Sequence, residues 1–225
     1  MKKLNDREKV FAVIRKRLFN TQKIEFTDDY KTPLTNIIPD NFDEMFSQFK
    51  RELEALGGKA DQFTSTAELQ NAIFTNLKEN PLVFITDHIL NAYPQVVNHL
   101  NISTKIIREK DLIPVIPDSA SYKKTVNSID VAITDCLCAI AETGTIVFSG
   151  NSRLPIALAS QLIIVIEQNQ MLRSLDELFT GANFKDHKHS NLFMTTGPSQ
   201  TADIEKELVK GVHGPKYVFA FFMHR

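Results

Sequence analysis

The chain has 225 residues, of which 43% are hydrophobic and 24% charged, and its formal net charge at pH 7 is −1. These values are ordinary for a soluble globular protein with a substantial core, and the near-neutral charge gives no electrostatic basis for binding nucleic acid or an anionic membrane. No apolar run reaches the ~20 residues of a membrane-spanning helix, and the polar residues 1–7 do not resemble an export signal. We therefore expect a cytoplasmic protein.

Residues 1–39 are predicted to form an N-terminal helical arm. A helix is expected over 5–19, because every fourth position there is apolar on one face, at Val10, Ile14 and Leu18. Residues 20–39 contain two prolines and are expected to be irregular. Such an arm could pack on its own domain or on a second subunit, so the sequence is compatible with a homo-oligomer.

From residue 40 onward, helical and strand patterns alternate. The predicted helices are 41–56, 66–77, 87–100 with an interruption at Pro94, 119–127, 153–159 and 174–179. The predicted strands are 59–63, 82–86, 102–107, 113–116, 131–134, 162–166, 192–195 and 217–223. This alternation predicts an α/β fold, with a layered, mainly parallel sheet flanked by helices, in one domain over 40–225.

An acidic residue and a glycine interrupt the apolar run between residues 139 and 148, at Glu142-Thr143-Gly144. A carboxylate among apolar neighbours is costly unless it is paired, hydrogen-bonded or protonated, which makes Glu142 a candidate for chemistry. Glycine at this place permits a bend or a close backbone approach. The other interpretation is a hairpin corner whose Glu142 faces solvent.

A second candidate stretch follows the strand predicted over 192–195. Residues 196–199, with the sequence TGPS, form a sharp turn, and Ser199 or Thr201 can cap a helix predicted from about 202 to 210. Free backbone N–H groups at such a helix start, together with the helix dipole, favour a bound anion. The stretch is therefore predicted to be an anion cradle.

Two acidic residues, Asp203 and Glu205, fall in the first turn of that predicted helix. They complement the helix dipole, but they would also repel a phosphate. A metal, or a cationic or hydroxylated ligand held by Asp203, is therefore the other interpretation of this stretch.

Histidines and cysteines give fewer candidates. His213 lies between two glycines, where it either presents an imidazole to a pocket or fixes a loop by hydrogen bonds. His187 and His189 lie in a polar segment without a visible third ligand, so no metal is expected there.

Cys136 and Cys138 are too close for an ordinary disulfide and have the wrong spacing for a cluster. We expect reduced thiols, at least one of them buried.

Four blocks of residues together resemble the LUD domain family. They read IAETGT at 140–145, RL at 153–154, TGPSQTADIE at 196–205 and GVHGP at 211–215. The order and spacing of all four blocks fit the family, the last two blocks are quite specific, and the resemblance covers about residues 40–225. The stretch DCLC at 135–138 departs from the family pattern, in which small or apolar residues are usual.

The resemblance implies a fold similar to that of glucosamine-phosphate isomerase, ribose-phosphate isomerase and the CoA transferases. It also implies a part in the oxidation of L-lactate to pyruvate, beside two partner proteins that carry iron–sulfur clusters. This chain would bind no cofactor, and would act as a non-redox subunit that binds a small carboxylate or other anionic ligand, or assembles its partners. A third interpretation is a regulatory or scaffold module whose glycine motifs are only structural. The main alternative is a stand-alone isomerase or acyl transferase. Glu142 would then be base or nucleophile, by analogy with the Glu-x-Gly of CoA transferases.

These inferences predict one shared pocket. Its candidate catalytic residues are Glu142 and His213. Its candidate ligand-binding residues are Thr143, Gly144, Arg153, Thr196, Gly197, Ser199, Thr201, Asp203 and Gly214.

Overall fold

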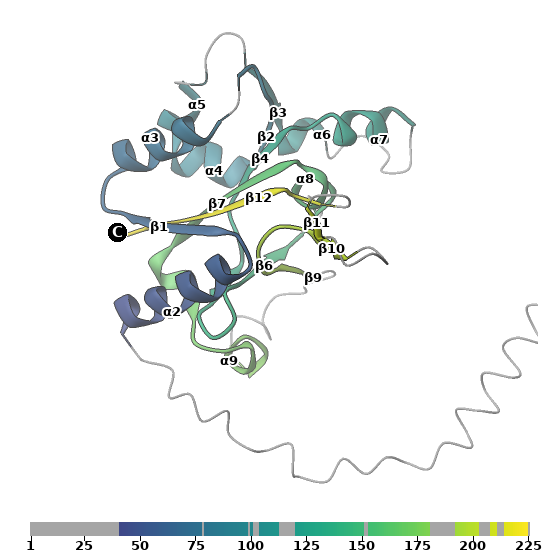
Figure 1. The fold of residues 1–225 in the computed structure, drawn as a ribbon. Coiled ribbons are helices and arrows are strands. Elements are labelled where there is room, and N and C mark those ends of the chain that lie inside the picture. The colour runs from purple at the N-terminus through teal and green to yellow at the C-terminus, as the bar shows by residue number, and fades with distance from the viewer. Residues whose placement is uncertain are drawn as a thin grey trace, which may run out of the picture. The chain divides into compact units, whose positions relative to one another are not determined.

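The structure, a computed structural model, describes residues 41–224 apart from 78, 99, 101–103, 113–119, 151–152, 181–191, 203–207 and 211–213 (Figure 1). The predicted arm over 1–39, the strand predicted over 113–116, and His187 and His189 lie outside the described residues.

A six-stranded parallel sheet forms the centre of the domain and confirms the predicted α/β class. Its strand order is β1-β12-β7-β4-β2-β3, and every neighbouring pair is parallel. The strands are β1 (Lys59–Phe63), β2 (Leu82–Ile85), β3 (Lys105–Arg108), β4 (Val131–Thr134), β7 (Gln161–Glu167) and β12 (Tyr217–Met223).

The helices predicted between residues 41 and 179 are present to within a few residues, and the short helix over Glu109–Leu112 was not predicted. The described helices are α2 (Phe42–Ala55), α3 (Thr66–Asn76), α4 (Asp87–Ala92), α5 (Pro94–Asn98), α6 (Glu109–Leu112), α7 (Ala120–Asn127), α8 (Arg153–Leu158) and α9 (Leu175–Thr180), with the 3-10 turn η2 (Gln168–Gln170). Pro94 separates α4 from α5, as its missing N–H predicts. Ser65 caps α3 in a capping box with Glu68.

A second, smaller sheet of order β8-β5-β6-β9 was not predicted as a separate unit. It contains β5 (Cys138–Ile140), β6 (Thr145–Ser149), β8 (Met171–Leu172) and β9 (Leu192–Thr195). The β5–β6 and β6–β9 pairs are antiparallel, and β5–β8 is parallel. A further antiparallel pair joins β10 (Gln200–Ala202) to β11 (Leu208–Lys210).

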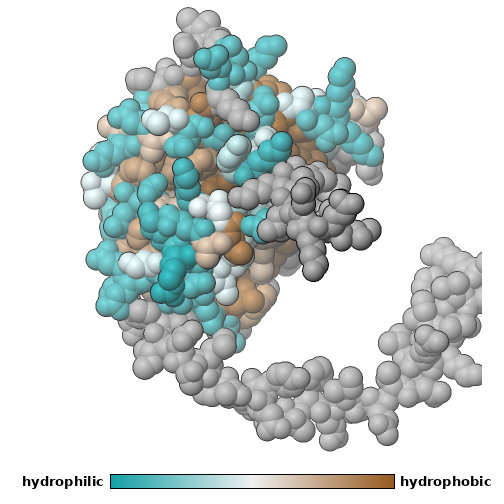
Figure 2. Space-filling model, in the orientation of Figure 1, coloured by the Kyte–Doolittle hydropathy of each residue, from teal (hydrophilic) through white to brown (hydrophobic). Residues whose placement is uncertain are grey.

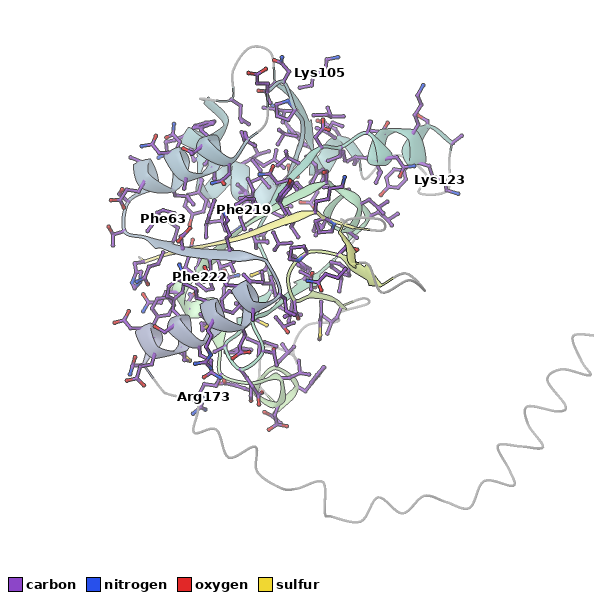
Figure 3. All side chains as sticks on the ribbon, viewed as in Figure 1. Phe63, Lys105, Lys123, Arg173, Phe219 and Phe222 are labelled. Carbon is purple, nitrogen blue, oxygen red and sulfur yellow. The ribbon has the colours of Figure 1, made fainter. Side chains whose placement is uncertain are left out.

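The main sheet has an apolar core on each face, because its strands are buried on both sides. On β12, Phe222 belongs to the core that holds α2 and the smaller sheet, whereas Phe219 belongs to the core that holds α3, α4 and α5. Figure 3 shows these two rings on opposite sides of the strand. Helices α2 and α3 therefore cover opposite faces of the sheet, as Figure 1 also shows.

Hydrophilic residues dominate the face of the molecule shown in Figure 2, and apolar residues lie scattered among them. Within the described part of the chain, no helix has the length and apolar character needed to cross a membrane.

Candidate functional site

The Glu142 stretch is the turn at the tip of the β5–β6 hairpin. Backbone N–H groups of Ala141 and Glu142 donate to the carbonyl oxygens of Leu172 and Arg173, at 2.8 and 3.0 Å, and so continue the pairing of β5 with β8. Glu142 is half-buried. Its carboxylate has no hydrogen-bond or ion-pair partner among the described residues, so it is available to a ligand or to water.

Gly144 is required by a close approach of helix α2. Its φ is +64°, and a Cβ at this position would lie 2.5 Å from the backbone nitrogen of Leu53. No side chain fits at that distance, because the obstacle is helix backbone and cannot rotate away. The glycine predicted to line a pocket therefore has a packing role, in which it fits the hairpin tip against α2.

A short chain of hydroxyl groups joins the first and third sequence blocks. The hydroxyl of Thr143 donates to Thr145 Oγ1 at 2.7 Å, and the hydroxyls of Thr145 and Thr196 are also 2.7 Å apart. Thr145 is only 9% exposed. Residues 51 positions apart in the sequence thus share a hydrogen bond at the junction of the two turns.

The TGPS turn packs on the same end of α2. Gly197 has φ +88°, and a Cβ there would lie 3.2 Å from the Cβ of Leu56, which is the C-cap residue of α2. The hydroxyl of Thr195 donates to the Gly197 carbonyl at 3.1 Å, and Gln200 Nε2 donates to the Leu56 carbonyl at 2.8 Å. The last turn of α2 thus supports both signature turns.

The fourth block meets the third block at the start of β12. The Ser199 N–H donates to the Pro215 carbonyl at 2.8 Å. A Cβ on Gly214 would lie 3.0 Å from the Ser199 Cβ and 3.4 Å from the carbonyl oxygen of Ala157. Contacts thus join the first, third and fourth blocks, and α8, the helix that begins with the second block, meets Gly214 through Ala157.

The helix predicted over 202–210 is wrong. Residues 200–202 and 208–210 are instead β10 and β11, paired antiparallel with Thr201 opposite Val209. Glu and Lys are good helix formers, but helix propensity is a weak preference, and tertiary contacts such as the one between Gln200 and Leu56 override it. Among the described residues of this stretch, which leave out 203–207, no helix stands behind the predicted anion cradle.

Several predicted site residues are not placed. Asp203 and His213 lie outside the described residues, and the side chains of Arg153 and Thr201 are also outside the described part. The shared pocket between Glu142, Ser199 and His213 stays a prediction.

Both cysteines are free and buried, which confirms the prediction that at least one of them is buried. Burial raises the pKa of Cys138 to about 12, and burial, with Cys138 and Asp135 nearby, raises the pKa of Cys136 well above its ordinary value. A raised pKa keeps a thiol protonated, and a protonated thiol is a poor nucleophile. Among the described residues, no group of three His, Cys, Asp or Glu side chains could hold a metal ion.

We expect the two thiols to react slowly while the chain is folded. At pH 7.5 the native protein should react with a chromogenic disulfide reagent at least ~100-fold more slowly than free glutathione does, because so little thiolate is present. Both thiols should react rapidly once urea unfolds the chain. The absorbance of the released chromophore measures how many thiols react. A fast phase of thiol reaction in the native protein would contradict this prediction.

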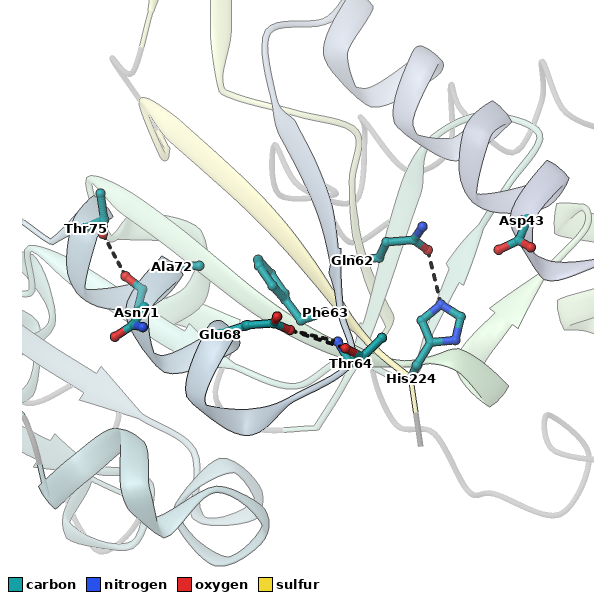
Figure 4. Close-up of a pocket in the computed structure, with 9 residues that line it drawn as sticks. All are labelled: Asp43, Gln62, Phe63, Thr64, Glu68, Asn71, Ala72, Thr75 and His224. Atoms are coloured by element: carbon teal, nitrogen blue, oxygen red, sulfur yellow. Dashed lines mark hydrogen bonds between the residues drawn. The ribbon is translucent and has the colours of Figure 1, made fainter.

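The structure also has an open groove of about 770 Å³ that the sequence did not suggest, between α3, β1 and the start of α2 (Figure 4). His224 Nε2 lies 3.1 Å from Gln62 Oε1 at one side of it. Glu68, on the other side, accepts hydrogen bonds from the backbone N–H groups of Thr64 and Ser65. None of the predicted site residues lines this groove.

Comparison with known proteins agrees with the sequence blocks. "Lactate utilization protein C" of an Exiguobacterium species is 33% identical over 102 residues, covering 42% of this chain and 44% of that protein. The protein of the same name from Deinococcus radiodurans is 32% identical over 91 residues, covering 39% of this chain and 43% of that protein. These matches span less than half the length of either curated relative.

A crystal structure of a DUF162 family protein from Deinococcus radiodurans has the same fold. Its TM-score is 0.59 at 20% identity, and the match covers 82% of this chain and 99% of that one. The family model described as LUD domain matches residues 46–223, which is most of the chain and contains all four blocks. The chain therefore belongs to the LUD domain family.

Proposed function

We propose that this chain is a component of a system that oxidises L-lactate to pyruvate. It binds a small carboxylate or assembles its partner proteins, and it carries no electrons itself. Family membership supports this role, as do relatives that are named lactate utilization protein C.

The observation that carries the proposal is the junction of the family's sequence blocks. Thr145 and Thr196 share a hydrogen bond, and Ser199 is bonded to Pro215, so turns far apart in the sequence form one structural unit. Beside this unit lies the half-buried carboxylate of Glu142. Hydroxyl groups and a carboxylate can together bind the hydroxyl of a small ligand, and this supports a binding role for the unit.

The number and burial of the cysteines support the proposal that partner proteins, and not this chain, transfer the electrons. An iron–sulfur cluster is usually held by four thiolates, and this chain has two cysteines, both buried and with raised pKa values. We propose that two partner proteins carry the clusters of this system.

Reconstitution tests the proposal. The purified chain is mixed with the two iron–sulfur partners, and lactate-dependent reduction of a dye is followed by absorbance. We expect omission of this chain to lower the rate to background. An unchanged rate without it would contradict the proposed role.

A stand-alone isomerase or acyl transferase is the alternative, favoured by the half-buried Glu142 at the hairpin tip. In that case the pure chain turns over a sugar phosphate or a CoA thioester without partners. Glu142→Gln then lowers that rate by at least ~100-fold, the usual contribution of a general acid or base. Glu79→Gln, at an exposed site, is the matched control. Wild-type-like turnover by the Glu142 variant would remove this carboxylate from the mechanism.

A further inference from the structure

Polar residues gather at the carboxyl edge of the main sheet, where four neighbouring strands end. The strands themselves are largely apolar, but Thr86 follows β2, Asp135 follows β4, Glu109 follows β3, and Glu167 is the last residue of β7. Since parallel strands end at one edge, these residues share that edge.

The chain leaves β2 and β4 on opposite faces of the sheet. After β2 it enters α4, whose Ile89 packs in the core with α3. After β4 it enters β5, whose Ala139 packs in the core with α2. The two strands are neighbours in the sheet, so the segments that follow them move apart to opposite faces and leave a crevice at the strand ends. In open parallel sheets, ligands bind in the crevice outside the carboxyl ends of two such strands.

Three side chains meet at this crevice. The hydroxyl of Thr86, which is only 4% exposed, donates to Asp135 Oδ1 at 2.8 Å. The other oxygen, Asp135 Oδ2, lies 3.5 Å from His88 Nδ1. Asp135 is thus oriented by a buried hydroxyl on one side and contacts an imidazole on the other. The His88 side chain is 57% exposed and so is accessible to a ligand.

A carboxylate 3.5 Å from Nδ1 influences which nitrogen of the ring carries the proton. It favours the tautomer with the proton on Nδ1, which leaves the lone pair of His88 Nε2 as a hydrogen-bond acceptor. Such a nitrogen can accept a hydrogen bond from a ligand hydroxyl and can take up its proton. The Thr86–Asp135–His88 arrangement is therefore suited to a hydroxyl-bearing ligand.

A cation lies at the end of the adjacent strand. Arg108, the last residue of β3, is paired in register with Ile85, the residue that precedes Thr86. It is exposed and has no ion-pair partner in the described part of the chain. A guanidinium binds a carboxylate through two parallel hydrogen bonds. The nearby Glu109 carboxylate already accepts a hydrogen bond from the Asp87 N–H, at 3.2 Å.

We propose that the crevice between β2 and β4 binds a small 2-hydroxy acid. The hydroxyl donates to His88 Nε2, and the carboxylate binds Arg108. The junction of Ser199 and Pro215 precedes the first residue of β12 and so lies at the amino edge of the sheet, which makes the crevice a separate site. The proposal rests on the proposed function for the choice of L-lactate as probe.

Imidazole nitrogen spectra of the full chain, labelled with 15N, test this site. The six histidines give separate signals, and His88→Asn identifies the one that belongs to His88. L-Lactate is titrated beside propionate, which has the same carbon skeleton without the hydroxyl. We expect a saturable shift of the His88 signal with lactate, and binding of propionate that is about tenfold weaker, the value of one hydrogen bond to a polar site.

Two variants and a control complete the test. Asp135→Asn should abolish the preference for lactate over propionate, and Arg108→Gln, at an exposed position, should weaken both ligands about tenfold. His224→Asn, in the groove beside α3, should change neither. Equal responses to the two acids, or a His88 signal that lactate leaves unchanged, would overturn the proposal.

The two proposals fail separately. If His88 does not respond although omission of the chain abolishes dye reduction, this site is overturned and the proposed function stands. If His88 binds lactate although dye reduction does not need the chain, the site stands and the proposed function fails.

Discussion

Replacement of Gly144 with alanine is expected to lower the free energy of unfolding by about 3–5 kcal/mol. The added Cβ would lie 2.5 Å from the Leu53 nitrogen and 3.0 Å from the carbonyl carbon of Glu52. Both are helix backbone, so α2 or the hairpin must move, and the positive φ adds strain. The midpoint of urea unfolding, followed by circular dichroism, measures the loss.

Gly150→Ala is the matched control. Gly150 also has a positive φ, +110°, but a Cβ there meets no atom within 4 Å. The control isolates the backbone strain, which we expect to cost about 1–2 kcal/mol. Equal losses in the two variants would show that the contact with α2 contributes nothing.

Replacement of Phe222 with alanine should cost about 3–5 kcal/mol, the usual range for a buried phenylalanine. Its side chain is fully buried, and its ring lies 5.3 Å from the ring of Phe46 and 5.1 Å from that of Phe49, centroid to centroid. Both partners are on α2, so the substitution leaves a cavity between the helix and the central sheet. Urea unfolding again measures the loss.

Phe179→Ala, at the end of α9, provides the comparison. Its ring is 43% exposed, so the same change of side chain should cost less than about 1 kcal/mol. A loss at Phe222 as small as that at Phe179 would mean that α2 does not depend on this ring for its place on the sheet.

Most strands of the central sheet could be predicted from the sequence, because burial on both faces leaves a clear pattern. Strands such as β7 are buried on both faces and therefore appear as continuous apolar runs, and Pro94 and Ser65 mark helix boundaries through local chemistry. The sequence did not distinguish the smaller sheet from the central one, because β5 and β6 are as apolar as the central strands. The β10–β11 pair was missed because contacts with distant residues, not local preference, decide its conformation.

The crevice at the carboxyl edge of the main sheet could not be predicted from the spacing of residues along the sequence. Asp135 was noted only as part of a departure from the family pattern, and its partner Thr86 lies 49 residues earlier. Nothing in either local sequence indicates the contact. It exists because β2 and β4 are neighbours in the sheet, and the order of strands is a property of the whole fold.

The last turn of α2 has a consequence for how the family can vary. Gly144 packs against the backbone of Leu53, and Gly197 packs against Leu56. One stretch of α2 therefore contacts both signature turns. Neither turn can acquire a larger residue unless the helix withdraws, and a helix that withdraws opens a gap at the other turn. The place of one helix therefore constrains Gly144 and Gly197 together, although two separate parts of the chain contribute them.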